Sequence, residues 1–464
     1  MNINKRRSPS STIAISVVVL ISFITLLQGI WSPVSFAASS AGVSPSPPPA
    51  GTFNVQVQAL KVTQGVRGDI PSRTAPGDGL VLVADGAVHV ANRRTVVRAY
   101  PWVEVGPEAT APPLTARLWA YRDGEPLPGS PIMPVNPRLE SITPGWTMEE
   151  MRGDAYKSWN FLLPQAWVTL ASWEESFDLR FVVEANPPGA NYWPECEGCD
   201  DDNTVILNGQ EFTYVPRLIL KPYFVDHTIT IDEDKGINIT FPGPTRDEFH
   251  AALRTVHSLL PIGDGAWGMV ILPQTRVAWH GPLKEGDERV FAEAMIERYF
   301  PGGSLETSQP GVYHLFLFSP STYHETMVGR SERGSLGMAW VGRPYVQAPT
   351  RGPTLVHELT HAIGLSHAGN RNGEADGGGF NADYPDARGR VEPNAYGFDL
   401  WSMRAIPPDG GREGTFDYMS YGPDSHWVSI YTWENAARLL GQPNLGVTAN
   451  LPAPRNRYTT FPRP

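Results

Sequence analysis

The segment His357–His367 constrains the fold of this chain more than any other stretch. It reads His-Glu-Leu-Thr-His-Ala-Ile-Gly-Leu-Ser-His, so its first two histidines lie four residues apart, about one turn of a helix. Apolar residues repeat every four positions at Leu355, Leu359 and Ile363. On a helix, Leu359 would lie about 200° around the axis from the first histidine. The sequence therefore predicts a helix with one face in a core and the other open to a cleft.

The polar face of this helix has the residue types of a catalytic zinc site. Gly364 predicts the helix end, because glycine readily adopts the left-handed conformation that terminates a helix. The chain can then bring His367 beside His357 and His361, and three protein ligands leave a fourth position for water. Glu358 follows the first ligand, where a carboxylate can act as general base and then as acid toward the leaving amine. We expect one catalytic Zn²⁺ on the three histidines.

A second segment, Phe416–Tyr421, contains a methionine downstream of the third histidine. Together with the long zinc motif it resembles the metzincin clan of zinc peptidases. The resemblance implies an α+β catalytic domain that hydrolyses peptide bonds in a protein or peptide substrate. It also implies that Met419 forms the hydrophobic floor below the histidines and that Tyr421 stabilises the tetrahedral intermediate, as the matching tyrosine does in astacins and serralysins. Ala368, directly after the third histidine, matches none of the named subfamilies.

The same resemblance gives roles to two flanking segments. Tyr431–Leu440 resembles the last helix of the clan, with Thr432 as the expected N-cap. Another segment lies where metzincins have an edge strand, and there it would pair with an extended substrate; the alternative is an ordinary buried strand. The residues of this possible substrate-binding strand are Gly337, Met338, Ala339 and Trp340.

The N-terminus has the pattern of a secretory signal peptide over residues 1–37. A basic start at Lys5–Arg7 precedes the uncharged run Ile13–Leu27 and the small residues around a cleavage site before Ala38. The alternative is an uncleaved membrane anchor, because Thr12–Trp31 is just long enough to span a bilayer. We expect a secreted protein in which a Pro/Ser-rich linker, residues 38–52, precedes the folded part.

The folded part divides into two regions by pattern. Residues 53–224 contain short β-branched and aromatic runs separated by Pro and Gly, which predicts an all-β, immunoglobulin-like sandwich. Residues 225–445 alternate helical and strand patterns, including a helix capped by Thr245, and would form the zinc metallopeptidase domain. Residues 446–464 would be a C-terminal tail. The sandwich could be a propeptide, a substrate-binding module or a spacer.

Composition excludes several classes of protein. A net charge of −11 argues against a nucleic-acid binder and against a protein of anionic membrane surfaces, since both need a basic face. The chain has 14 Trp, 16 Tyr and 18 Phe, enough aromatic residues to build a sizeable core, which excludes a disordered protein.

Two further segments leave alternatives open. Cys196 and Cys199 predict a disulfide in an oxidising compartment; the alternatives are a structural metal site, or a thiolate that blocks the zinc in a latent enzyme. The acidic segment Glu374–Asp386 suggests Ca²⁺, but it lacks the spacing of a calcium loop, so a solvated loop is favoured.

The sequence as a whole predicts a secreted zinc endopeptidase. Two rival hypotheses are a secreted binding or adhesion protein with a vestigial zinc domain, and a zinc hydrolase of cell-wall peptides.

Overall fold

The computed structural model describes most of the folded part of the chain. The described residues are 53–67, 88–106, 111–136, 145–170, 176–189, 192–232, 234–281, 288–305, 311–320, 337–369, 380–422 and 425–441. The predicted signal peptide, the linker 38–52, the tail 446–464 and residues 374–379 of the acidic segment lie outside them. Among the described residues no helix is long and apolar enough to cross a membrane.

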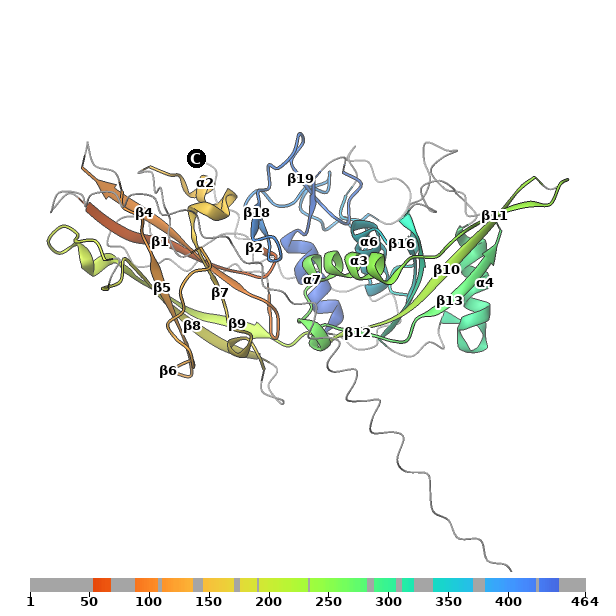
Figure 1. Ribbon diagram of the computed structural model, residues 1–464, viewed down its shortest axis with the longest axis horizontal. Coiled ribbons are helices and arrows are strands. Elements are labelled where there is room, and N and C mark those ends of the chain that lie inside the picture. Colours follow the sequence, from red (N-terminus) through yellow and green to blue (C-terminus); the bar gives the residue numbers. More distant parts are fainter. Residues whose placement is uncertain are drawn as a thin grey trace, which may run out of the picture. The chain divides into compact units, whose positions relative to one another are not determined.

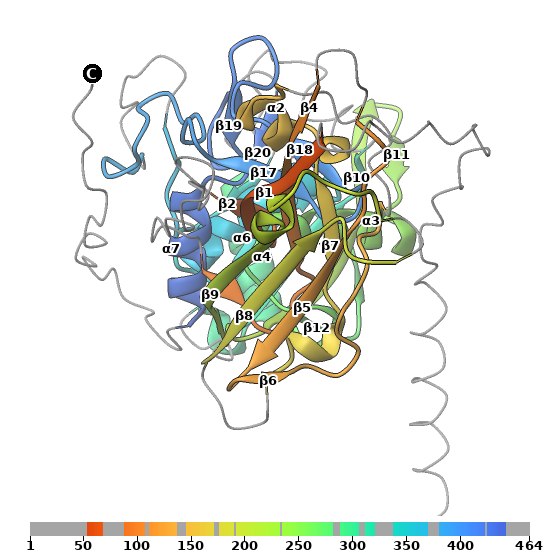
Figure 2. The same ribbon diagram turned by 90° about the vertical axis from the view of Figure 1, so that its left-hand side faces the viewer.

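Two sheets that face one another across a shared core form the N-terminal region (Figure 2). One sheet has the order β1 (Phe53–Thr63), β4 (Val96–Val105), β7 (Trp159–Leu162). The other has the order β3 (His89–Val90), β9 (Thr204–Thr213), β8 (Ser176–Ala185), β5 (Ala116–Arg122), β6 (Glu125–Pro126). In β8 every second residue from Phe177 to Ala185 is buried, which is the alternation that a strand with one face in a core requires. An immunoglobulin-like topology stays a prediction.

A mixed seven-stranded sheet organises the C-terminal region. Its order is β11 (Ile237–Phe241), β10 (Leu218–Asp232), β14 (Val312–Phe318), β16 (Tyr345–Pro349), β15 (Met338–Ala339), and β12 (Met269–Ile271) and β13 (Thr275–His280) also pair with β10. All pairs are parallel except those of β11 and β15, which are antiparallel. The predicted domain boundary between Phe224 and Val225 falls inside β10, which belongs to the seven-stranded sheet from Leu218 onward.

Helices cover both faces of this sheet (Figure 1). On one face, α3 (Arg246–Leu259), α6 (Gly352–Ile363) and α7 (Ile430–Leu440) contribute to the larger core. On the opposite face, α4 (Glu288–Tyr299) packs over a smaller aromatic core. The remaining elements are α2 (Met148–Gly153), β2 (Val66–Arg67), β17 (Tyr396–Asp399), β18 (Arg404–Ile406), β19 (Thr415–Asp417) and β20 (Ser425–Trp427).

The helix caps agree with the sequence prediction in one case and differ in another. Thr245 caps α3 through a capping box with Glu248, as the sequence predicts. For α7 the prediction of Thr432 as the cap is wrong. Its N-cap is Ser429, whose side chain accepts the Thr432 N–H, so the helix begins one residue earlier than predicted.

Buried polar contacts join the N-terminal region to the C-terminal region. Strand β2 pairs with β17, and Trp433 of α7 donates its indole N–H to the Val88 carbonyl. The fully buried Arg93 donates to the carbonyls of His257, Leu260 and Ile262 at the C-terminal end of α3, at 2.7–2.9 Å. The Leu260 carbonyl also accepts the Ile262 N–H, but the described contacts give the His257 and Ile262 carbonyls no backbone donor, so separation of the two regions would leave these two groups unpaired.

We predict that Arg93→Met destabilises the whole protein. The variant keeps an unbranched side chain but leaves the buried carbonyls of His257 and Ile262 without a donor, so the free energy of unfolding should fall by on the order of 3 kcal/mol. Chemical denaturation measures this loss. The matched control is Arg289→Met, because the exposed Arg289–Glu293 pair should contribute no more than about 0.5 kcal/mol. A similar small loss for both variants would contradict the role of Arg93.

Candidate metal centre

Helix α6 carries the first two histidines and has the predicted start and end. Pro353 lies in the first turn, where a missing N–H costs nothing. Gly364 ends the helix at φ 129°, a conformation that side-chain-bearing residues rarely adopt. Leu355 and Leu359 are fully buried in the larger core. The apolar face of α6 is thus anchored, and its other face is free to form a site.

The structure brings the three predicted ligands together. The Nε2 atom of His361 lies 3.2 Å from Nε2 of His357 and 3.0 Å from Nε2 of His367. Among the described residues these three form the one group of metal-binding side chains, with ligand atoms within 4.8 Å of one another. Three nitrogens at about 2.0–2.1 Å from a tetrahedral zinc would be about 3.3–3.4 Å apart. The observed separations are close to this geometry.

The protonation states of the His357 and His361 imidazoles are also those that metal binding requires. Nδ1 of His357 lies 2.8 Å from the Tyr418 carbonyl, and Nδ1 of His361 lies 2.7 Å from the Leu365 carbonyl. A carbonyl only accepts, so both Nδ1 atoms carry the proton and both Nε2 atoms present lone pairs in the neutral rings. Burial lowers the pKa of both rings, to about 4 for His357, which favours these neutral forms. Lone pairs that converge in this way could hold a metal ion.

The third histidine is held differently. Among the described residues, Nδ1 of His367 is buried without a hydrogen-bond partner. Its Nε2 lies 2.8 Å from the Tyr421 hydroxyl, which can donate to it. Burial lowers the pKa of His367 to about 3, and the neighbouring His361 and His357 contribute to this shift. This ring is therefore neutral at working pH as well.

The segment with the predicted methionine packs under the helix. Met419 is fully buried in the larger core, and its carbonyl accepts the N–H of Ala368, the residue after the third histidine. The hydroxyls of Tyr418 and Thr360 are 2.9 Å apart, and Thr360 in turn donates to the Val356 carbonyl. Tyr418 thus holds the helix through its hydroxyl as well as through its carbonyl.

Sequence reasoning missed Tyr418 and Asp417 as parts of this site. The carboxylate of Asp417, which is fully buried, accepts the N–H of Met419 at 2.7 Å and that of Ser429 at 2.9 Å. It therefore fixes both the turn that carries the Tyr418 carbonyl and the start of α7. The only signal in the sequence is a lone acidic residue two positions before the methionine, which a local pattern cannot distinguish from a surface aspartate.

Glu358 is buried beside the histidines. Burial raises the pKa of its carboxyl to about 8, and this carboxyl in turn contributes to the raised pKa of Tyr421, so the two side chains share one site. A Cβ atom on Gly337 would come within 2.6 Å of the Glu358 carboxyl, so a larger residue there would displace this carboxyl. A cation on the histidines would favour the ionised carboxylate, because opposite charges lower the pKa of an acid.

Tyr421 is the exposed member of the group. Its side chain is 59% exposed, yet the hydroxyl reaches His367. Its pKa is raised to about 12, mainly by burial of the hydroxyl end, so it stays a proton donor at neutral pH.

The segment predicted as an edge strand runs along the site. Met338 and Ala339 form β15, which pairs antiparallel with β16 and is the last strand of the described sheet. At its start Gly337 contacts Glu358, and beyond its end the Gly342 N–H donates to the His361 carbonyl at 2.9 Å. One side of β15 thus has no neighbouring strand among the described residues, and the strand lies next to the candidate metal ligands.

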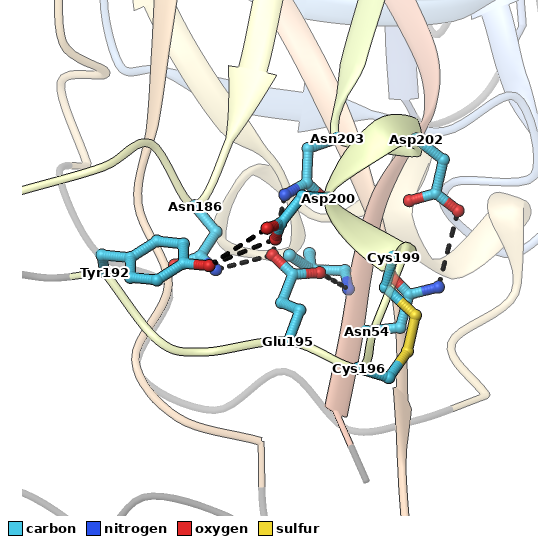
Figure 3. Close-up of a disulfide and its surroundings, with 10 residues drawn as sticks. Asn54, Asn186, Tyr192, Glu195, Cys196, Cys199, Asp200, Asp202 and Asn203 are labelled. Carbon is cyan, nitrogen blue, oxygen red and sulfur yellow. Dashed lines mark hydrogen bonds between the residues drawn. A yellow bond between two sulfur atoms is a disulfide. The ribbon is translucent and has the colours of Figure 1, made fainter. Parts of the chain in front are cut away.

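The two cysteines lie away from these residues, in the N-terminal region. Cys196 and Cys199 form a disulfide beside β1, as their spacing predicts, next to the carboxylates of Glu195, Asp200 and Asp202 (Figure 3). Neither sulfur is a free thiol, so the latency hypothesis loses its thiolate. Glu195 instead accepts hydrogen bonds from Asn186, Asn203 and the Val55 N–H, which makes it a structural carboxylate.

Comparison of the chain with family models, with curated proteins and with solved structures finds no match. The function must therefore be argued from the site itself.

We predict that the purified chain binds one Zn²⁺. His357→Ala should weaken zinc binding by at least about 100-fold, since it removes a ligand and loss of a supporting contact alone costs 10–100-fold. Competition with a chromophoric chelator measures the affinity, and elemental analysis measures the stoichiometry. His280→Ala is the matched control, because this exposed histidine at the end of β13 lies outside the group. Equal affinity in both variants would contradict the assignment.

The pH dependence of zinc affinity should differ between the wild type and Glu358→Gln. The lowered pKa values of the histidines mean that protons compete for the ligand nitrogens only at acidic pH. The pKa of Glu358 is raised to about 8, so below this pH its carboxyl is protonated in the metal-free protein. A bound cation would favour loss of this proton, so protons compete with zinc binding below pH 8. Wild-type affinity should therefore rise with pH between about 5 and 8, by up to about tenfold per unit. Glu358→Gln should show a flat profile there, and parallel profiles would contradict this account.

Proposed function

We propose that this chain is a secreted zinc-dependent endopeptidase of metzincin type. The observation that carries the proposal is the convergence of three neutral imidazoles beside a buried carboxyl, a tyrosine hydroxyl and an edge strand. Each of these groups has a use in peptide hydrolysis, and together they provide every function that the reaction needs. The metzincin-like fold is part of the same proposal.

Each group of the candidate site would have a separate role in the hydrolysis. A zinc ion on His357, His361 and His367 would supply Lewis acidity, which polarises a carbonyl and lowers the pKa of water. The Glu358 carboxylate would take a proton from the attacking water and give it to the leaving amine nitrogen. The Tyr421 hydroxyl would donate a hydrogen bond to the carbonyl oxygen as negative charge develops on it. The free edge of β15 would hold the substrate backbone extended.

Two rival functions fit fewer of the observations. A binding protein with a vestigial zinc domain has no use for a buried carboxyl whose burial costs stability. A hydrolase of cell-wall peptides would share the metal chemistry, but a short branched substrate would make little use of a strand edge.

Ca²⁺ is not needed for any step of the proposed reaction, and among the described residues the histidine group is the one candidate metal site.

We predict that Glu358→Gln strongly slows cleavage of an unfolded protein substrate by the chain. The variant keeps the size and burial of the side chain but removes the base, so kcat should fall by about 10²–10⁴-fold. Zinc content should stay at one ion per chain, which distinguishes loss of the base from loss of the metal. Cleavage by both proteins would point to another base, and cleavage by neither, with zinc bound, would contradict the proposed function for this class of substrate.

We predict a smaller, kcat-specific loss for Tyr421→Phe. Removal of one hydrogen bond to the developing oxyanion should lower kcat by about 10²-fold with little change in KM. Tyr156→Phe, at an exposed tyrosine of the N-terminal region, is the matched control. A rise in KM at unchanged kcat would instead assign Tyr421 to ground-state binding.

A further inference from the structure

A pocket of about 470 Å³ opens directly beyond the edge strand β15. Trp340 and Val341, which follow this strand, form one wall, and Ile296 of α4 and Leu305 contribute to its lining. The side chain of Val341 is 48% exposed, so the pocket is open to solvent. The residues given catalytic roles above do not line it.

Successive side chains along β15 point to opposite faces of the sheet, and this alternation shows on which face the pocket lies. Met338 and Trp340 pack with the aromatic core under α4, whereas Ala339 between them packs with the core that contains α6. Paired residues of neighbouring strands point to the same face of a sheet. A peptide added to the free edge of β15 would therefore direct alternate side chains toward the metal and toward the α4 face.

The lining of the pocket indicates the chemistry of its occupant. Ile296, Leu305, Trp340 and Val341 offer aliphatic and aromatic surface to an apolar side chain, and Gly303 and Ser304 add backbone and hydroxyl groups to the same lining. A charged side chain would lose hydration against the apolar wall, so the pocket should prefer large apolar side chains to lysine.

We infer that this pocket is a specificity subsite, which binds a large apolar side chain of a polypeptide paired with the edge of β15. The inference rests on the proposed function, because it takes the edge of β15 as the position of the substrate backbone. In this inference one side chain of the substrate is recognised on the α4 face of the sheet. The residues with proposed catalytic roles do not line this pocket. Trp340 is its central wall.

The test uses the zinc-loaded chain and a peptide library in which each position in turn carries leucine or lysine. At one position the wild type should prefer leucine by about tenfold or more in kcat/KM, the range expected for an apolar pocket. Trp340→Ala should reduce this preference to about threefold or less, while the matched control Trp267→Ala, at an exposed tryptophan outside the pocket, should leave it unchanged. Val341→Glu should shift the preference toward lysine, a gain that an unfolded variant could not show.

A second measurement separates this inference from the proposed function. The Glu358→Gln chain is mixed with peptides that carry a photoreactive leucine analogue, and the cross-linked residues are mapped by mass spectrometry. Cross-links to residues 296–305 or 340–343 without cleavage by the wild type would contradict the peptidase function but support the pocket as a peptide site. Cross-links confined to other residues, or an unchanged preference in Trp340→Ala, would overturn the inference even if the chain is a peptidase. Absence of both cross-linking and cleavage would overturn both.

Discussion

The buried carboxylate of Asp417 is the interaction on which the rest of the site depends. By accepting the N–H groups of Met419 and Ser429, it fixes the turn below α6 and the start of α7 at once. The turn places the Tyr418 carbonyl on Nδ1 of His357, which sets the proton on the side away from the other histidines. Helix α7 in turn contacts the N-terminal region, because the Trp433 indole N–H donates a hydrogen bond to the Val88 carbonyl. A carboxylate this deeply buried is costly, and several hydrogen bonds to it offset that cost.

Hydrogen bonds to neighbouring carbonyls hold the imidazoles of His357 and His361 in place, and the convergence of their lone pairs has an electrostatic cost. Lone pairs of His357 and His361 face one another at 3.2 Å, and the nearby Glu358 carboxyl is buried with a raised pKa. Both features are unfavourable in a neutral pocket, and a divalent cation would relieve both, since it attracts the lone pairs and favours the ionised carboxylate. Under the proposed function, the stability of the folded chain and its affinity for zinc would therefore be linked.

Local spacing predicts part of this structure well, and contacts between distant segments set the rest. The helix that carries the zinc motif and the Thr245 cap of α3 follow from local spacing, because each depends on neighbours a few residues away. The contacts of Arg93 with residues 257–262, and those of Asp417, join segments that no local pattern links. The predicted boundary within β10 failed for the same reason, since one continuous strand forms part of the second sheet while its sequence resembles the strands before it. The pocket beyond β15 is likewise formed by residues that only the fold brings together.

The most direct test of the zinc assignment is a crystal structure of the zinc-loaded chain with diffraction data collected on both sides of the zinc absorption edge. Our account predicts one strong anomalous peak about 2.0–2.1 Å from the Nε2 atoms of His357, His361 and His367. A peak at other residues, or none in crystals grown with zinc, would contradict the central claim that these imidazoles form a catalytic metal centre.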